Sequence, residues 1–196
     1  MDANTLRRAC AATEPIVEHL SQADYAKPTP CTEWSVRDLA NHLLGTLELG
    51  RALLSDTPPE APVGPGEVPG VDLAGDDPAK AYRVGVESLL AAAAGDTFSR
   101  VHQTPLGDMP GAMLGGFTTL DIFVHGWDLA RATGQTTGMD DGLAEELLGF
   151  ARQAVTEESR APRIGPEDAA PEGASATERL MAYMGRTPRV PTRYCT

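Results

Sequence analysis

Residues 113–129, MLGGFTTLDIFVHGWDL, form the most apolar of the helices that the sequence predicts, and they decide the fold. Apolar side chains recur through this stretch at helical spacing, and Gly134 follows it as a C-terminal stop signal. A helix this apolar must be buried over much of its circumference, so other helices have to pack around it. The stretch therefore predicts the central helix of an all-α protein.

The rest of the chain supplies the helices that this packing needs. Helical periodicity or helix-capping signals mark residues 4–21, 35–54, 77–95, 140–155 and 175–185. Ser35 with Asp38, and Ser175 with Glu178, have the spacing of capping boxes, while Asp77 precedes Pro78 as a cap before a first-turn proline. These signals place the helix starts.

Irregular segments rich in proline and glycine separate these helices. They cover about residues 55–76, 96–111 and 158–174, although Phe98 to Gln103 has the composition of one short strand. We therefore expect residues 1–196 to form a single domain. Its predicted architecture is a four-helix bundle with a long crossover from the second to the third helix and extra C-terminal helices.

Composition excludes several classes of function. The 196 residues carry a formal charge of −12 and have no run of basic residues, so we expect no nucleic-acid partner. No stretch approaches the ~20 apolar residues that span a bilayer, and the three cysteines are too few for a disulfide framework. We expect a cytoplasmic protein without a membrane partner, and the apolar helices are compatible with a homodimer.

A carboxylate and two imidazoles are the best candidates for chemistry. Asp121 and His125 stand at i and i+4 in the apolar helix, so both can reach a single cation. Taken alone, such a pair is more often a hydrogen bond on a helix surface. The apolar surroundings change this interpretation, because a buried carboxylate needs a partner. His42 in the second helix would add another nitrogen, giving a metal site with open positions, although alone it fits a core histidine.

Three more polar side chains lie close to these in the sequence. Asp38 stands four residues before His42 and is a further candidate ligand. Its position in the capping box already gives it a structural role, so we expect it to lie near the metal at most, without binding it. Asp128 and Arg131 have the spacing of an ion pair on a helix surface. Two other roles are open: Asp128 could orient His125, and Arg131 could bind an anionic ligand. Cys31 precedes the second helix, where packing is a better interpretation than reactivity.

Two motifs resemble a known family. CTEWSVRDLANHLLG (31–45) and GFTTLDIFVHGWDLARATG (116–134) are similar to the DinB-like metalloenzyme superfamily, in its actinobacterial branch related to mycothiol-dependent maleylpyruvate isomerase. The closing GASATERLMAYMGRTP (173–188) resembles the end of short members described as metal-binding proteins. The resemblance implies a four-helix bundle that holds a divalent metal, with zinc expected, on His42, Asp121 and His125. The isomerase has Glu at the position of Asp121, so the carboxylate here is one methylene shorter.

The function that the resemblance implies is metal-dependent thiol chemistry. We expect a thiol transferase or isomerase that acts on a small electrophilic substrate through a metal-bound thiolate, with mycothiol or a similar low-molecular-weight thiol as co-substrate. Maleylpyruvate isomerisation itself is disfavoured, because the isomerase has a separate C-terminal domain and only about 60 residues follow the apolar helix here. The alternatives are a hydrolase or lyase that uses metal-bound water, and a non-catalytic metal- or ligand-binding protein whose fourth ligand is Asp38 or Cys31. The sequence names no general acid or base.

Overall fold

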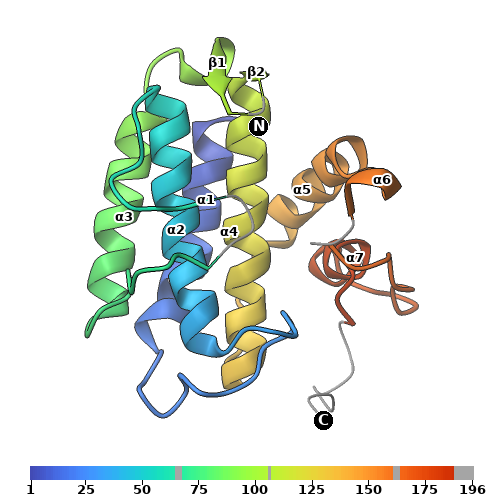
Figure 1. Cartoon of the computed structure of the whole chain (residues 1–196). Helices are drawn as coiled ribbons and strands as arrows, with labels where there is room; N and C mark the ends of the chain where they lie inside the picture. Colours follow the sequence, from blue (N-terminus) through green and yellow to red (C-terminus); the bar gives the residue numbers. More distant parts are fainter. Residues whose placement is uncertain (65–67, 106, 161–163, 188–196) are drawn as a thin grey trace. The chain divides into compact units, whose positions relative to one another are not determined.

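The computed structural model describes residues 1–64, 68–105, 107–160 and 164–187 (Figure 1). They divide between Thr137 and Gly138 into two compact units, which we describe separately. The first contains α1 (Ala3–Glu18), α2 (Val36–Ser55), α3 (Pro78–Ala92), the 3₁₀ turn η1 (Thr97–Ser99), β1 (Val101–Thr104), β2 (Gly107–Pro110) and α4 (Gly111–Thr133). The second contains α5 (Asp141–Ala154), α6 (Glu157–Arg160) and α7 (Ala176–Tyr183). The helical fold class is confirmed, while the single domain over residues 1–196 stays a prediction.

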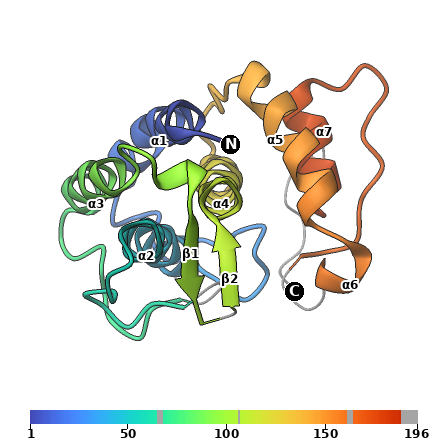
Figure 2. The ribbon, with the colours of Figure 1, turned by 90° about the horizontal axis from the view of Figure 1, so that it is seen from above.

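Helices α1 to α4 form a bundle that Figure 2 shows nearly end on. Each helix has two neighbours: α1 packs against α3 and α4, and α2 packs against the same two helices. Leu6, Leu39, Leu47, Phe123 and Leu129, which come from three of the four helices, are fully buried. Burying such side chains is the main force that holds amphipathic helices together.

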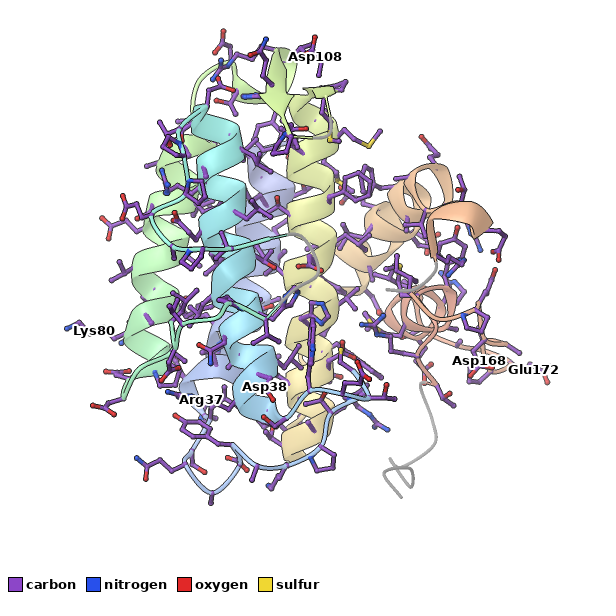
Figure 3. The ribbon with its side chains drawn as sticks, in the orientation of Figure 1. Arg37, Asp38, Lys80, Asp108, Asp168 and Glu172 are labelled. Atoms are coloured by element: carbon purple, nitrogen blue, oxygen red, sulfur yellow. The ribbon has the colours of Figure 1, made fainter. Side chains whose placement is uncertain are left out.

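The long crossover lets α2 and α3 run in the same direction. Arg37 near the start of α2 and Lys80 near the start of α3 lie toward the same end of the bundle, and Asp108 of the hairpin lies at the other end (Figure 3). A 20-residue helix such as α2 is about 30 Å long, so the chain must return over that distance before α3 can begin. This requirement explains the length of the irregular segment predicted at 55–76.

The crossover is fixed to α2 along its return. At its start, the backbone N–H of Glu60 donates to the Glu48 carboxylate. At its end, the Asn41 side-chain oxygen accepts hydrogen bonds from the backbone N–H groups of Leu73 and Ala74, at 2.7 and 3.0 Å. Between these points, a Cβ on Gly45 would lie 2.9 Å from the Pro69 ring. The described part of the crossover therefore packs against α2; residues 65–67 lie outside the described residues.

The segment 96–111, predicted as irregular apart from a short strand at Phe98 to Gln103, contains the η1 turn and a β-hairpin, and β1 overlaps the end of that predicted strand. Strands β1 and β2 pair antiparallel, with Val101 opposite Pro110 and Thr104 opposite Gly107. His102 on β1 is buried and places Nδ1 2.9 Å from a carboxylate oxygen of Asp56, the C-cap of α2. This contact ties the hairpin to the end of α2 and gives His102 a structural role.

The predicted helix starts agree with the structure. Ser35 and Asp38 form the capping box of α2, Asp77 caps α3, and Ser175 with Glu178 caps α7. Asp140 likewise caps α5, where it was predicted to begin the helix. Local sequence decides these positions because a cap satisfies backbone N–H groups within one turn of itself.

The second unit packs α5 against α7. The Tyr183 hydroxyl donates to the carbonyl oxygen of Val155, and the guanidinium of Arg160 lies 4.5 Å from the centre of the Tyr183 ring. The irregular segment predicted at 158–174 begins within α6, and its residues 161–163 lie outside the described residues. None of the described helices is long and apolar enough to cross a membrane.

Helices α1 and α4 approach closely at Gly126. A Cβ at this position would lie 2.4 Å from the Thr13 hydroxyl oxygen and 3.1 Å from its Cβ. We therefore expect Gly126→Ala to lower the free energy of unfolding by about 1–3 kcal/mol, as over-packing does, although alanine favours a helix more than glycine does. Urea denaturation followed by tryptophan fluorescence measures this, because Trp34 and Trp127 both lie in the first unit.

The double variant Thr13→Ala, Gly126→Ala provides the matched control. Removing the Thr13 hydroxyl and methyl relieves the clash, so the same glycine substitution should cost much less in that background. An equal cost in both backgrounds would contradict the assigned contact.

Candidate metal centre

Two helices bring the predicted ligands together. His42 lies on α2, while Asp121 and His125 lie one turn apart on α4. Each offers a ligand atom, and these atoms all lie within 4.8 Å of one another. Among the described residues, neither Asp38 nor Cys31 joins this group of three. Their role as metal ligands remains a prediction that we develop below.

The Asp121 carboxylate bridges the two imidazoles. Its Oδ1 lies 3.2 Å from His125 Nε2, and its Oδ2 lies 3.2 Å from His42 Nε2. The rings of His42 and His125 meet edge to face, with centroids 4.7 Å apart. Both imidazoles are buried, whereas 37% of the Asp121 side chain is exposed. The group therefore combines a partly exposed carboxylate with a His42 Nε2 that is shielded from solvent.

The electrostatics follow from this arrangement. Burial by itself would raise the pKa of Asp121, but the neighbouring imidazoles of His125 and His42 lower that pKa well below its usual range. Burial opposes the charge on His125 too, yet the Asp121 carboxylate and hydrogen bonds to Asp121, Asp128 and Cys31 raise its pKa well above the usual range. Both shifts favour the charged forms of this pair, a carboxylate beside an imidazolium.

Asp128 lies on the other side of the His125 ring. Its carboxylate is fully buried and lies 3.0 Å from Nδ1, which donates a hydrogen bond to it. This contact leaves Nε2 of His125 facing Asp121 and His42. A carboxylate that orients the far nitrogen of a ligating histidine is common around metal ions. The geometry supports the orienting role suggested for Asp128, which stays a prediction.

Asp38 and Arg131 have other contacts. The Asp38 carboxylate accepts hydrogen bonds from the backbone N–H and the hydroxyl of Ser35, at 2.9 and 2.6 Å. It lies at the start of α2, as Figure 3 shows. The Arg131 guanidinium lies 5.4 Å from the centre of the Trp127 ring. The structure thus gives Asp38 its capping role and places Arg131 against an aromatic ring.

Two side chains complete the surroundings of the group. The Thr46 hydroxyl donates to Oδ2 of Asp121, which helps hold the carboxylate between the histidines. The Trp34 ring lies 4.6 Å from the His42 ring and 6.2 Å from that of His125, centroid to centroid. Thr46 stands four residues after His42, so helical periodicity indicates that the two side chains share one face of α2. Trp34 lies in a loop, where no periodicity indicates its direction.

The loop before α2 has a defined conformation that places Trp34 and Cys31. The Thr29 hydroxyl donates to the carbonyl oxygen of Trp34 at 2.8 Å and lies 3.1 Å from both the backbone N–H and the carbonyl oxygen of Cys31. Thr29 is buried, and such hydroxyl-to-backbone bonds stabilise tight turns. The Cys31 sulfur reaches the Asp128 side of His125, so the sequence interpretation of Cys31 as simply packed was incomplete.

Comparison with known proteins identifies the family. Residues 6–130 match the model of the mycothiol maleylpyruvate isomerase N-terminal domain. The chain belongs to this family. The match covers α1 to Ala130 of α4 and therefore includes all three candidate ligands. It confirms the resemblance that the two motifs suggested.

Two curated relatives match nearly the whole chain. They are the uncharacterized proteins MT0763 and Rv0738 from the Mycobacterium tuberculosis strains CDC 1551 / Oshkosh and ATCC 25618 / H37Rv. Each is 34% identical over 186 residues, which cover 93% of this chain and 96% of the relative. No solved structure matches the chain. The similarity to these relatives thus extends beyond residue 130, where the family match ends.

Proposed function

We propose that this protein is a divalent-metal-dependent enzyme that transfers a low-molecular-weight thiol to a small electrophile or isomerises such a substrate. His42, Asp121 and His125 hold the cation, and zinc is the metal that suits two imidazoles and one carboxylate. Mycothiol is the thiol that the name of the family suggests. The proposal concerns catalysis by the α1 to α4 unit, which contains the candidate ligands.

The observation that carries the proposal is a three-donor group that remains open. Catalytic zinc sites have three protein ligands and an open position, whereas structural sites are closed by four. Here three donors converge, and one of them, the Asp121 carboxylate, belongs to a side chain that is 37% exposed. With neutral imidazoles, the three side chains carry a single negative charge, so a divalent cation keeps one unit of positive charge. That charge favours an anionic fourth ligand from solution.

The neighbouring side chains prepare this group for its role. Thr46 holds one oxygen of the Asp121 carboxylate by a hydrogen bond, and Asp128 fixes the orientation of the His125 ring. The Trp34 ring packs against the His42 ring, with centroids 4.6 Å apart. These contacts set the donor atoms before a ligand arrives, which reduces the cost of ordering them on binding.

The chemistry that a bound divalent cation supplies is Lewis-acid activation of a thiol or of water at neutral pH. The thiol is favoured here because the chain belongs to a family named for mycothiol. Around the cation, the protein binds and orients: two buried imidazoles and one partly exposed carboxylate define the side from which a thiol and an electrophile approach.

Conjugation of a thiol to 1-chloro-2,4-dinitrobenzene tests this proposal. In this reaction the thiol sulfur displaces chloride from the ring and the thiol proton goes to solvent. We expect the zinc-loaded protein to bind mycothiol in a saturable manner and to accelerate its conjugation at least about 100-fold over the solution reaction, the scale of a modest catalytic effect. Calorimetry and absorbance spectroscopy measure the two effects.

The controls separate metal-dependent activity from reactivity of the polypeptide. The metal-free protein and His42→Ala should show neither effect, whereas His19→Ala, which changes a histidine outside the candidate group, should keep both. Zinc binding without thiol binding or acceleration, for mycothiol and a set of simpler thiols, would reject the enzyme and favour a non-catalytic metal-binding protein.

A further inference from the structure

A second group of metal-ligand atoms meets the opposite nitrogen of His125. Cys31 Sγ lies 3.8 Å from Nδ1 of His125 and 3.5 Å from Oδ2 of Asp128, and that oxygen lies 3.0 Å from Nδ1. The three residues come from the loop before α2 and from two adjacent turns of α4. Asp128 is fully buried, His125 is buried and Cys31 is half-buried.

These separations match those around a tetrahedral thiophilic cation. For zinc, metal–nitrogen and metal–oxygen bonds of about 2.0–2.1 Å, with a metal–sulfur bond of about 2.3 Å, place nitrogen and oxygen about 3.3 Å apart and sulfur about 3.5 Å from either; a larger soft cation needs slightly wider spacing. The observed distances of 3.0, 3.5 and 3.8 Å lie within a few tenths of an ångström of these values. Small side-chain shifts would complete the geometry.

We propose that Cys31, Asp128 and Nδ1 of His125 form a second cation position that takes a thiophilic metal and excludes a cation from the first position. This second position goes beyond the proposed function. That function uses only the first position, which consists of His42, Asp121 and Nε2 of His125. A neutral imidazole has one proton and one lone pair, so it can offer only one of its nitrogens to a metal at a time.

Each of the two arrangements keeps the remaining His125 proton in a hydrogen bond. When Nε2 binds a metal, the Nδ1 proton lies on Asp128, at 3.0 Å. When Nδ1 binds a metal, the Nε2 proton faces Oδ1 of Asp121, at 3.2 Å. A carboxylate therefore stabilises either tautomer, and the choice depends on which cation is present.

Charge and ligand type separate the two positions. A Cys31 thiolate and the Asp128 carboxylate carry two negative charges, which neutralise a divalent cation completely, while the first group carries one. Thiolate ligands favour soft cations and imidazole suits zinc, which also accepts thiolate, so a cation softer than zinc distinguishes the second position best. Binding at the second position releases two protons to solvent, one from the Cys31 thiol and one from Nδ1 of His125. It also gives the buried Asp128 carboxylate a direct positive partner.

Cadmium is the probe for this position, because a cadmium–thiolate bond gives an ultraviolet charge-transfer band. The experiment uses the full chain with Cys195→Ser, which leaves Cys31 and Cys10. Burial raises the pKa of the Cys10 thiol to about 12, so Cys10 supplies little thiolate at neutral pH. We expect one equivalent of cadmium with a strong charge-transfer band, and we expect this cadmium to lower the apparent zinc affinity of the first position at least tenfold.

Two variants decide the assignment. Cys31→Ser should abolish the band while zinc still binds at the first position. His42→Ala should abolish zinc binding while the cadmium band persists, which separates this proposal from the proposed function. Absence of the band in the parent, or an equal band in Cys31→Ser, would overturn the second position and leave Cys31 as a hydrogen-bond donor to Asp128. Loss of the band in His42→Ala, or simultaneous tight binding of zinc and cadmium, would overturn it in the form proposed here.

Discussion

Replacing His42 or His125 by alanine is expected to abolish zinc binding by the group of His42, Asp121 and His125. The parent protein, purified without chelators and loaded with zinc, should contain close to one equivalent of zinc by mass spectrometry. Each variant removes one of three ligand atoms that lie within 4.8 Å of one another. The zinc affinity should fall by more than about 100-fold, which exceeds the 10–100-fold effect of changing a residue that only orients a ligand.

The controls for this experiment address folding. Both histidines are buried, so an alanine leaves a cavity in the bundle and lowers stability. Asp121→Asn avoids that cavity because the two side chains have nearly the same volume and this one is partly exposed. It should lose zinc while circular dichroism shows unchanged helix content. His19→Ala should retain zinc. Retention of one equivalent in both His42→Ala and His125→Ala would reject these residues as ligands.

The second large effect concerns pH. In the metal-free protein the pKa of His125 lies well above its usual value, so the ring keeps its proton to a higher pH than a free imidazole does. The pKa of Asp121 lies well below its usual value, so its carboxylate stays charged over the same range. A cation can bind Nε2 of His125 only after that nitrogen has lost its proton. Proton release therefore accompanies metal binding, and lower pH must weaken it.

The expected slope follows from one displaced proton. Below the raised pKa of His125, the zinc association constant should increase about tenfold for each pH unit. Competition with a chelator of known affinity between pH 6 and pH 8 measures this slope, with the chelator's own protonation taken into account. Calorimetry in buffers of different ionisation enthalpy counts the released proton directly.

Asp128→Asn is the matched variant for the pH experiment. The hydrogen bond from His125 to Asp128 is one of the causes that raise the pKa of this histidine, so the variant should lower that pKa. The region of steep pH dependence should then end at a lower pH than in the parent. A zinc affinity that does not change between pH 6 and pH 8 would contradict the assignment of His125 as a protonated ligand.

Much of the fold could be predicted because its signals are local. The capping boxes at Ser35 and Ser175, the cap at Asp77 and the apolar periodicity of α4 each act within a few turns. Of the β-hairpin, only a short strand at Phe98 to Gln103 was predicted, which overlaps β1; β2 was not, since it has four residues and shows no alternation of apolar and polar side chains. Pairing between the two strands and the contact with Asp56 hold it in place.

The candidate site divides in the same way. Asp121 and His125 could be paired from the sequence, because residues four apart on a helix share one face. His42 lies on a different helix, so its place beside Asp121 and His125 depends on how the two helices pack. The family resemblance indicated this place more strongly than the spacing of residues did. No sequence pattern indicated that Cys31 reaches His125, 94 positions further along the chain.

The sequence by itself determined the helices other than α6, the caps at Ser35, Asp77, Asp140 and Ser175, and the i, i+4 pair on α4, and it indicated the family. Only the tertiary structure decided which nitrogen of His125 faces His42 and which faces Asp128 and Cys31. The physical reason is the range of the interactions. Backbone hydrogen bonds and caps are satisfied between near neighbours, whereas the surroundings of an imidazole are set by side chains that come together only when α2, α4 and the loop before α2 pack.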